Sequence, residues 1–335
     1  MAWLLRSLCS CAPLCRFGLC SMRVEDAALS VPPGAPPMDR HFTSSAAAGS
    51  LPSSPGQSRT GSSRPHRDTS RSCLLGAAIL LLSPRRLSMN QRPHLTNAPI
   101  TEAVLDIQVQ LPANVRLGNL EAMHRDIRDR YPNRRTRHRL EVNIKLEGEM
   151  PIATPPKEDG YLFQSQDGKR IVQARLDGFS FSQLKPYDTW DALRDEAKEL
   201  WARYVDIARP EIVKRIALRY INRMDLPLPI TDFKDYVRIG PEIAQGIPQA
   251  VQNFFLRLEI PYPSGALAIV TETLQPPADP AHAKTLPLIL DIDVIRTENF
   301  TAPFVDIWEK FEELRRMKND IFFSAITPKA EELFQ

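Results

Sequence analysis

The stretch Glu102–Leu111 has the sequence EAVLDIQVQL and indicates how the chain folds. Polar side chains stand at Asp106, Gln108 and Gln110. The apolar side chains between them recur at every second residue, at Ala103, Leu105, Ile107, Val109 and Leu111. Because successive side chains of a strand point to opposite faces of a sheet, this pattern predicts a β-strand that is buried on one face only.

Two amphipathic helices are predicted downstream of this strand. Leu117–Tyr131 has apolar residues at helical spacing and is stopped by Pro132. Asp188–Arg209 has a longer apolar stripe and ends at Pro210.

Alternating patterns between the two helices predict further strands, at Arg135–Glu147, Tyr161–Gln166 and Lys169–Leu176. The dipeptide Asp167-Gly168 favours a two-residue hairpin turn between the last two. We expect the final strand to continue through Phe179 and Phe181, past a bulge at Gly178.

The second half of the chain repeats this order. Strands are predicted at Ile212–Met224, Val251–Ile260, Leu267–Leu274 and Leu286–Ile295. Helices are predicted over Pro303–Asp320 and over Thr327–Phe334, where Thr327 is the N-cap and Pro328 takes the first helical position. A short helical piece is expected near Asp232–Val237.

These patterns predict an α+β fold made of a duplicated β-α-β-β-β-α unit. Several connections are too short for crossovers, so the sheet or sheets should be mainly antiparallel and backed by long amphipathic helices. The predicted halves are residues 89–209 and 210–335, packed as one body because Pro210 leaves almost no linker between them. Chance resemblance of two ordinary antiparallel units is the alternative.

Residues 1–88 differ in composition from the rest of the chain. They contain all five cysteines, ten arginines, four acidic residues and no lysine, so their formal charge is +6 and that of the body is −3. We predict a disordered or non-native leader, with Met89 as the physiological start; an organellar transit peptide is the alternative. The acidic, cysteine-free body excludes a disulfide scaffold and a cysteine nucleophile, and a nucleic-acid partner is not expected.

Charged residues are concentrated on the polar sides of the predicted strands. The candidate site residues are all predicted on these polar sides: Asp291, Asp293, Arg219, Arg223, Asn222, Lys145, Glu141 and Arg257. If they converge, the arginines and lysine could hold a phosphate, and Asp291 with Asp293 could hold Mg²⁺ or Mn²⁺. The simpler interpretation is a water-exposed sheet face with cross-strand ion pairs.

Motifs that would name a reaction are missing from the sequence. It has no Gly-x-Ser-x-Gly elbow, phosphate loop or dinucleotide fingerprint, and its histidines lack metal-ligand spacing. No apolar run of the body approaches the roughly 20 residues of a membrane helix, so insertion into a membrane is not expected.

Five short motifs occur in a fixed order along the body: NAPITEAV (97–104), GFSFS (178–182), LRYINR (218–223), LDIDV (290–294) and KNDIFF (318–323). Over residues 95–330 the chain resembles the sporadically distributed family of uncharacterised prokaryotic proteins of about 250 residues. The resemblance implies no catalytic residues, because none are established for that family. The resemblance implies an accessory role, with genome defence or mobile elements as an association only.

We therefore expect a cytoplasmic, non-catalytic module that binds a ligand or partner through its sheet face. The alternative is a metal-dependent enzyme acting on a phosphorylated small molecule or nucleotide. Convergence of Asp291, Asp293, Arg219 and Lys145 in one enclosed pocket would favour the enzyme. The sequence leaves the partner unknown and the formation of a homo-oligomer open.

Overall fold

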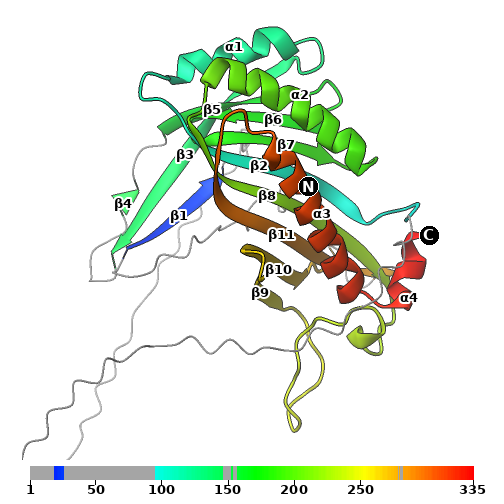
Figure 1. Ribbon diagram of the computed structural model, residues 1–335. Coiled ribbons are helices and arrows are strands. Elements are labelled where there is room, and N and C mark those ends of the chain that lie inside the picture. The colour runs from blue at the N-terminus through cyan, green and yellow to red at the C-terminus, as the bar shows by residue number, and fades with distance from the viewer. Residues whose placement is uncertain (1–18, 26–94, 146–151, 154–156, 278, 280–281) are drawn as a thin grey trace, which may run out of the picture. The chain divides into compact units, whose positions relative to one another are not determined.

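A computed structural model describes residues 19–25, 95–145, 152–153, 157–277, 279 and 282–335 (Figure 1). For residues 19–25, 140–145 and 152–153 it describes the backbone alone. The predicted leader lies outside the described residues except for 19–25, which form a strand. The prediction of a start at Met89 therefore stays a prediction.

The described strands form one antiparallel sheet, as predicted for an α+β chain. The short strand β4 (Ile152–Ala153) pairs with β3 beside the main path. The other strands follow one another across the sheet in the order β1 (Leu19–Glu25), β3 (Asn133–Lys145), β5 (Lys157–Gln164), β6 (Arg170–Arg175), β7 (Gly178–Leu184), β2 (Ile100–Gln110), β8 (Ile212–Pro227), β11 (Thr285–Thr301), β10 (Ala266–Leu274) and β9 (Phe255–Pro261).

Helices pack on one face of this sheet (Figure 1). They are α1 (Leu117–Ile127), α2 (Trp190–Ala208), α3 (Asp306–Ala325) and α4 (Pro328–Glu331), with 3₁₀ turns η1 (Phe233–Asp235) and η2 (Glu332–Phe334). Capping fixes two of the ends. Thr189 accepts the N–H of Ala192 at the start of α2, and Thr327 accepts that of Ala330 at the start of α4, as predicted.

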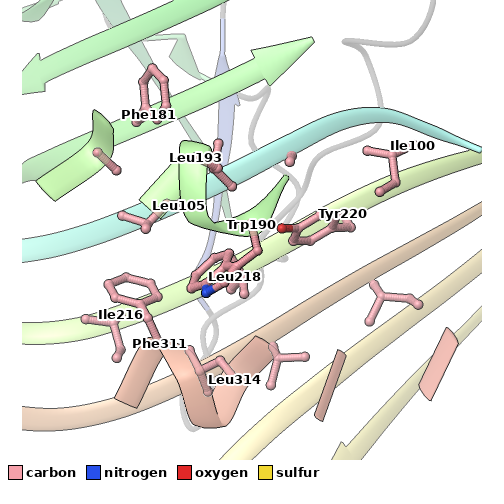
Figure 2. Close-up of a cluster of buried hydrophobic side chains, with 14 of the residues drawn as sticks. Ile100, Leu105, Phe181, Trp190, Leu193, Ile216, Leu218, Tyr220, Phe311 and Leu314 are labelled. Atoms are coloured by element: carbon pink, nitrogen blue, oxygen red, sulfur yellow. The ribbon is translucent and has the colours of Figure 1, made fainter. Parts of the chain in front are cut away.

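The hydrophobic core lies between the helices and the sheet. Figure 2 shows Leu105, Phe181 and Leu218 from three neighbouring strands gathered with Leu193 of α2 and Phe311 of α3. All five side chains are fully buried. Each such side chain contributes about 1.5–3 kcal/mol relative to an exposed one, so the alternation of the strands is what holds the helices in place.

Two predicted connections were wrong. The loop between β5 and β6 is longer than a two-residue turn: Ser165 N–H donates to Arg170 O at its base, and Gly168 adopts a φ of 72° within it. The second error is at Gly178, which begins a new strand instead of a bulge. Arg175 faces Gly178 in the β6–β7 register, so Leu176 and Asp177 form the tight turn.

The second half is simpler than the predicted repeat. Between β8 and β9 the described chain contains η1 and no α-helix. After its opening strand the second half has three strands, β9–β11, whereas the first half has β3 and β5–β7 on the main path of the sheet. The helix predicted over Pro303–Asp320 begins at Asp306 and reaches Ala325.

Strand β8 shows how the two faces of the sheet differ. Ile216, Leu218 and Tyr220 are buried on the helix side. Arg215 and Arg219 alternate with them and point to the other face, which no described helix covers. We call this second face, marked by Asp106, Arg175, Arg215, Arg219, Asp291 and Asp293, the polar face.

Candidate functional site

Asp106 of β2 joins two arginines on the polar face. Its Oδ1 accepts from Arg175 Nη2 at 2.7 Å, and its Oδ2 accepts from Arg215 Nη1 at 3.1 Å. The three residues come from β6, β2 and β8, and their side chains are all mostly buried. Charge-assisted bonds of this kind are about twice as strong as neutral ones, so this part of the face is held in one arrangement.

The ion pairs continue toward β3. Arg175 Nε lies 3.1 Å from Asp177 Oδ1, and Arg139 pairs with both Asp177 and Asp159. Arg137 also pairs with Asp159, at 2.5 Å. The register between β3 and β5 shifts at Arg137, and this bulge leaves Asp159 as the extra residue, aimed at the two arginines.

Arg219 and Asp291 form a two-pronged pair on the other side of Asp106. Arg219 Nε donates to Asp291 Oδ1 at 2.8 Å, and Nη2 donates to Oδ2. Burial lowers the pKa of Arg219, but its bond to Asp291 more than offsets this, so the net change is upward. Arg219, which was predicted to hold a phosphate, and Asp291, which was predicted to hold a metal ion, therefore neutralise each other's charge.

Asp293 is the carboxylate of this network for which no ion pair with an arginine is described. It faces Arg219 in the β8–β11 register, but its Oδ1 is buried and has no hydrogen-bond partner among the described residues. Burial raises the pKa of Asp293 to about 6, and the neighbouring Arg215 and Arg219 counter that rise only in part. Asp293 is thus an acceptor with unused capacity beside two cations.

Asp293 should make folding depend on pH. Its folded pKa of about 6 lies above the ordinary value of 3.8, so the folded state keeps a proton that the unfolded state has lost in this window. Stability should fall as the pH rises from 4 to 6. Asp293→Asn should then stabilise the chain by about 2–3 kcal/mol at pH 7, from about 1.4 kcal/mol per pKa unit.

Thermal or urea unfolding of both proteins between pH 3.5 and pH 7.5 measures this difference. The two curves should meet below pH 4. If Asp293→Asn is as stable as or less stable than the unchanged chain at pH 7, the raised pKa of Asp293 is contradicted.

The remaining predicted site residues lie elsewhere. Arg223 bonds to Asp225 at 3.0 Å and lines a separate cavity of about 280 Å³ together with Lys284. Arg257 pairs with Glu259 on its own edge strand, at 2.9 Å. The side chains of the other two, Glu141 and Lys145, lie outside the described residues.

Asn222, predicted on the polar face, is placed on the opposite one. It is buried in the middle of β8, between Tyr220 and Met224, and does not end the strand. Its Nδ2 donates to Leu290 O at 3.0 Å. The amide therefore satisfies a main-chain oxygen of β11 and is not available to a ligand on the polar face.

Sequence reasoning missed two buried ionisable groups on the helix side. Glu272 of β10 is 1% exposed, neither of its carboxylate oxygens has a described partner, and burial raises its pKa to about 8. Lys318 of α3 has its Nζ 3.8 Å from the centre of the Tyr220 ring, and burial lowers its pKa to about 7. Of these two residues, only Lys318 lies in one of the five sequence motifs, as the first residue of KNDIFF.

Comparison with known proteins adds no family. A scan against protein-family models and a search of curated proteins found no match to the chain. In the part that the structure describes, no group of three or more His, Cys, Asp or Glu side chains is placed to hold a metal ion. None of the helices described there combines the length and apolarity that a membrane crossing needs.

Proposed function

We propose that the chain is a non-catalytic binding module and that its ligand binds on the polar face at Asp293. The observation that carries the proposal is the buried Oδ1 of Asp293 without a hydrogen bond, beside carboxylates that all have arginine partners. A buried acceptor left unsatisfied costs about 1–3 kcal/mol, and a ligand that donates to it recovers that free energy.

The ligand class follows from the same geometry. The guanidinium groups of Arg215 and Arg219 are engaged by Asp106 and Asp291, whereas the carboxylate of Asp293 is the group with free capacity. A carboxylate pairs best with an ammonium or guanidinium donor. The proposed ligand therefore presents a cationic nitrogen, as a basic side chain or an amine does.

The alternative enzyme needs a different arrangement. Asp291 and Asp293 would have to hold Mg²⁺ or Mn²⁺ while Arg219 holds a phosphate. The two-pronged bond between Arg219 and Asp291 opposes both roles, because each group would first have to release the other. The binding module is favoured on this ground.

Thermal melting with a ligand panel tests the choice. We expect agmatine or spermidine to raise the melting temperature, and Mg²⁺ or Mn²⁺ with nucleotides to leave it unchanged. A ligand at a hundredfold its Kd adds about 2.7 kcal/mol. Asp293→Asn should remove the ligand-induced shift, whereas Asp129→Asn, the same change at a fully exposed position, should keep it. A shift with metal and nucleotide, or an amine shift that survives in Asp293→Asn, would contradict the proposal.

The proposal includes an origin of the fold by duplication, with α2 and α3 as corresponding long amphipathic helices. The strand order supports it. The opening strands of the halves, β2 and β8, are neighbours, and each is flanked by the last strand of its own half, β7 or β11. The helices α2 and α3 each follow that last strand.

The host context is also part of the proposal. The resemblance to the sporadically distributed prokaryotic family supports an accessory role, with genome defence as an association only. A cytoplasmic location is proposed with it. The predicted start of the physiological chain at Met89 is also part of the proposal. Intact-mass measurement of the native protein should give a product that begins at Met89, and a product that begins earlier would contradict this.

A further inference from the structure

Strand β9 ends the sheet, and no described strand pairs with its outer edge (Figure 1). Beyond its end, Tyr262 N–H donates to Ala266 O at 2.8 Å, in register with the β9–β10 ladder. Hydrogen-bonded residues alternate along an antiparallel strand. The main-chain groups of Phe255, Arg257 and Glu259 therefore point away from β10, toward the edge.

The side chains of β9 are unusually apolar for an exposed edge. Phe255 is 63% exposed and Ile260 is 37% exposed. Edge strands of monomers are commonly blunted by charges, and here Arg257 and Glu259 are the only two charges. They carry opposite signs and stand two residues apart, so the edge is neutral and can match a copy of itself.

We propose that β9 pairs antiparallel with β9 of a second copy of the chain, about a two-fold axis at Leu258. Outward-pointing residues must face outward-pointing residues, which restricts the axis to a few positions. An axis at Leu258 sets Arg257 opposite Glu259 of the second copy. Axes at Arg257 or Glu259 set identical charges opposite each other, so charge selects the register.

Both faces of the paired strands are complementary in this register. On the helix side, Leu258 faces Leu258 of the second copy and Leu256 faces Ile260. On the polar side, Phe255 faces Pro261, which lacks an N–H and so offers its carbonyl alone. The Cβ atoms of side chains opposite each other lie about 4.5–5.5 Å apart. At this distance Arg257 can form an ion pair with Glu259 of the second copy in place of Glu259 of its own strand.

Sedimentation equilibrium of the full chain tests the pairing. The unchanged protein should reach twice the chain mass of 37.9 kDa. Glu259→Arg and Arg257→Glu each set like charges opposite one another, and each should weaken dimerisation about tenfold to a hundredfold. An equimolar mixture of these two variants should restore the dimer, because every facing pair is then opposite in charge.

The mixture also shows that both variants are folded. Asp129→Arg makes the same change of charge at a fully exposed turn after α1 and should dimerise as the unchanged chain does. A monomeric unchanged chain at high concentration would overturn the proposal. So would a dimer that neither charge reversal weakens, or two weakened variants that fail to associate when mixed.

Discussion

Replacing Gly178 by alanine is expected to destabilise the chain by about 2–4 kcal/mol, as overpacking against a rigid neighbour does. An added Cβ would lie 2.3 Å from Ile107 O and 3.1 Å from Gln108 Cα, both in the main chain of β2. It would also lie 2.8 Å from Arg175 Nη2, the group that bonds to Asp106. Strands β7 and β2 would have to separate, and the ion-pair network would shift with them.

Urea denaturation of Gly178→Ala measures this effect, and Gly118→Ala is the matched control. Nothing lies within 4 Å of a Cβ added at Gly118, which is in α1. Alanine is favoured over glycine in a helix by up to about 1 kcal/mol, so the control should be slightly more stable than the unchanged chain. Equal stability of Gly178→Ala and the unchanged chain would contradict the close approach of β7 to β2.

Replacing Glu272 by glutamine is expected to stabilise the chain by about 3 kcal/mol at pH 7, from about 1.4 kcal/mol per pKa unit. The folded pKa of about 8 lies above the ordinary 4.5 because the carboxyl is buried. Between these values the folded state holds a proton that the unfolded state has released, so the stability of the unchanged chain falls as the pH rises from 4.5 to 8. Glutamine remains neutral throughout and removes this slope.

Unfolding free energies of Glu272→Gln measured from pH 4 to pH 9 test the prediction. The difference from the unchanged chain should vanish near pH 4 and grow up to pH 8. Glu309→Gln, at an exposed position of α3, should leave the pH dependence as it is. A Glu272→Gln protein that is no more stable than the unchanged chain at pH 8 would contradict the raised pKa of Glu272.

The sequence predicted the strands well because alternation reports burial directly. Arg219 and Asp291 were placed on polar strand faces from their spacing alone. Their pairing was not predicted, because it depends on the register between β8 and β11, and no local pattern specifies which strands become neighbours. The wrong assignment of Asn222 to the polar face could have been avoided. The alternation that puts Arg219 on the polar face puts position 222 on the same side as the buried Tyr220.

Features that depend on a partner strand were missed. The extra residue at Asp159 exists only relative to β3, and the tight turn at Leu176 and Asp177 was taken for a continuous strand with a bulge. Glu272 was missed because apolar residues lie on both sides of β10, so the alternation does not say which face is buried. Packing against other elements decides the first and the last of these, whereas the turn is local and joins the consecutive strands β6 and β7.

Carboxyl-carbon NMR titration of Asp293 tests the proposed site most directly. We predict a pKa of about 6 in the free chain and a lower pKa when agmatine is added, because a cationic donor stabilises the charged carboxylate. A pKa near 4 in the free chain, or a titration that agmatine leaves unmoved, would contradict ligand binding at Asp293.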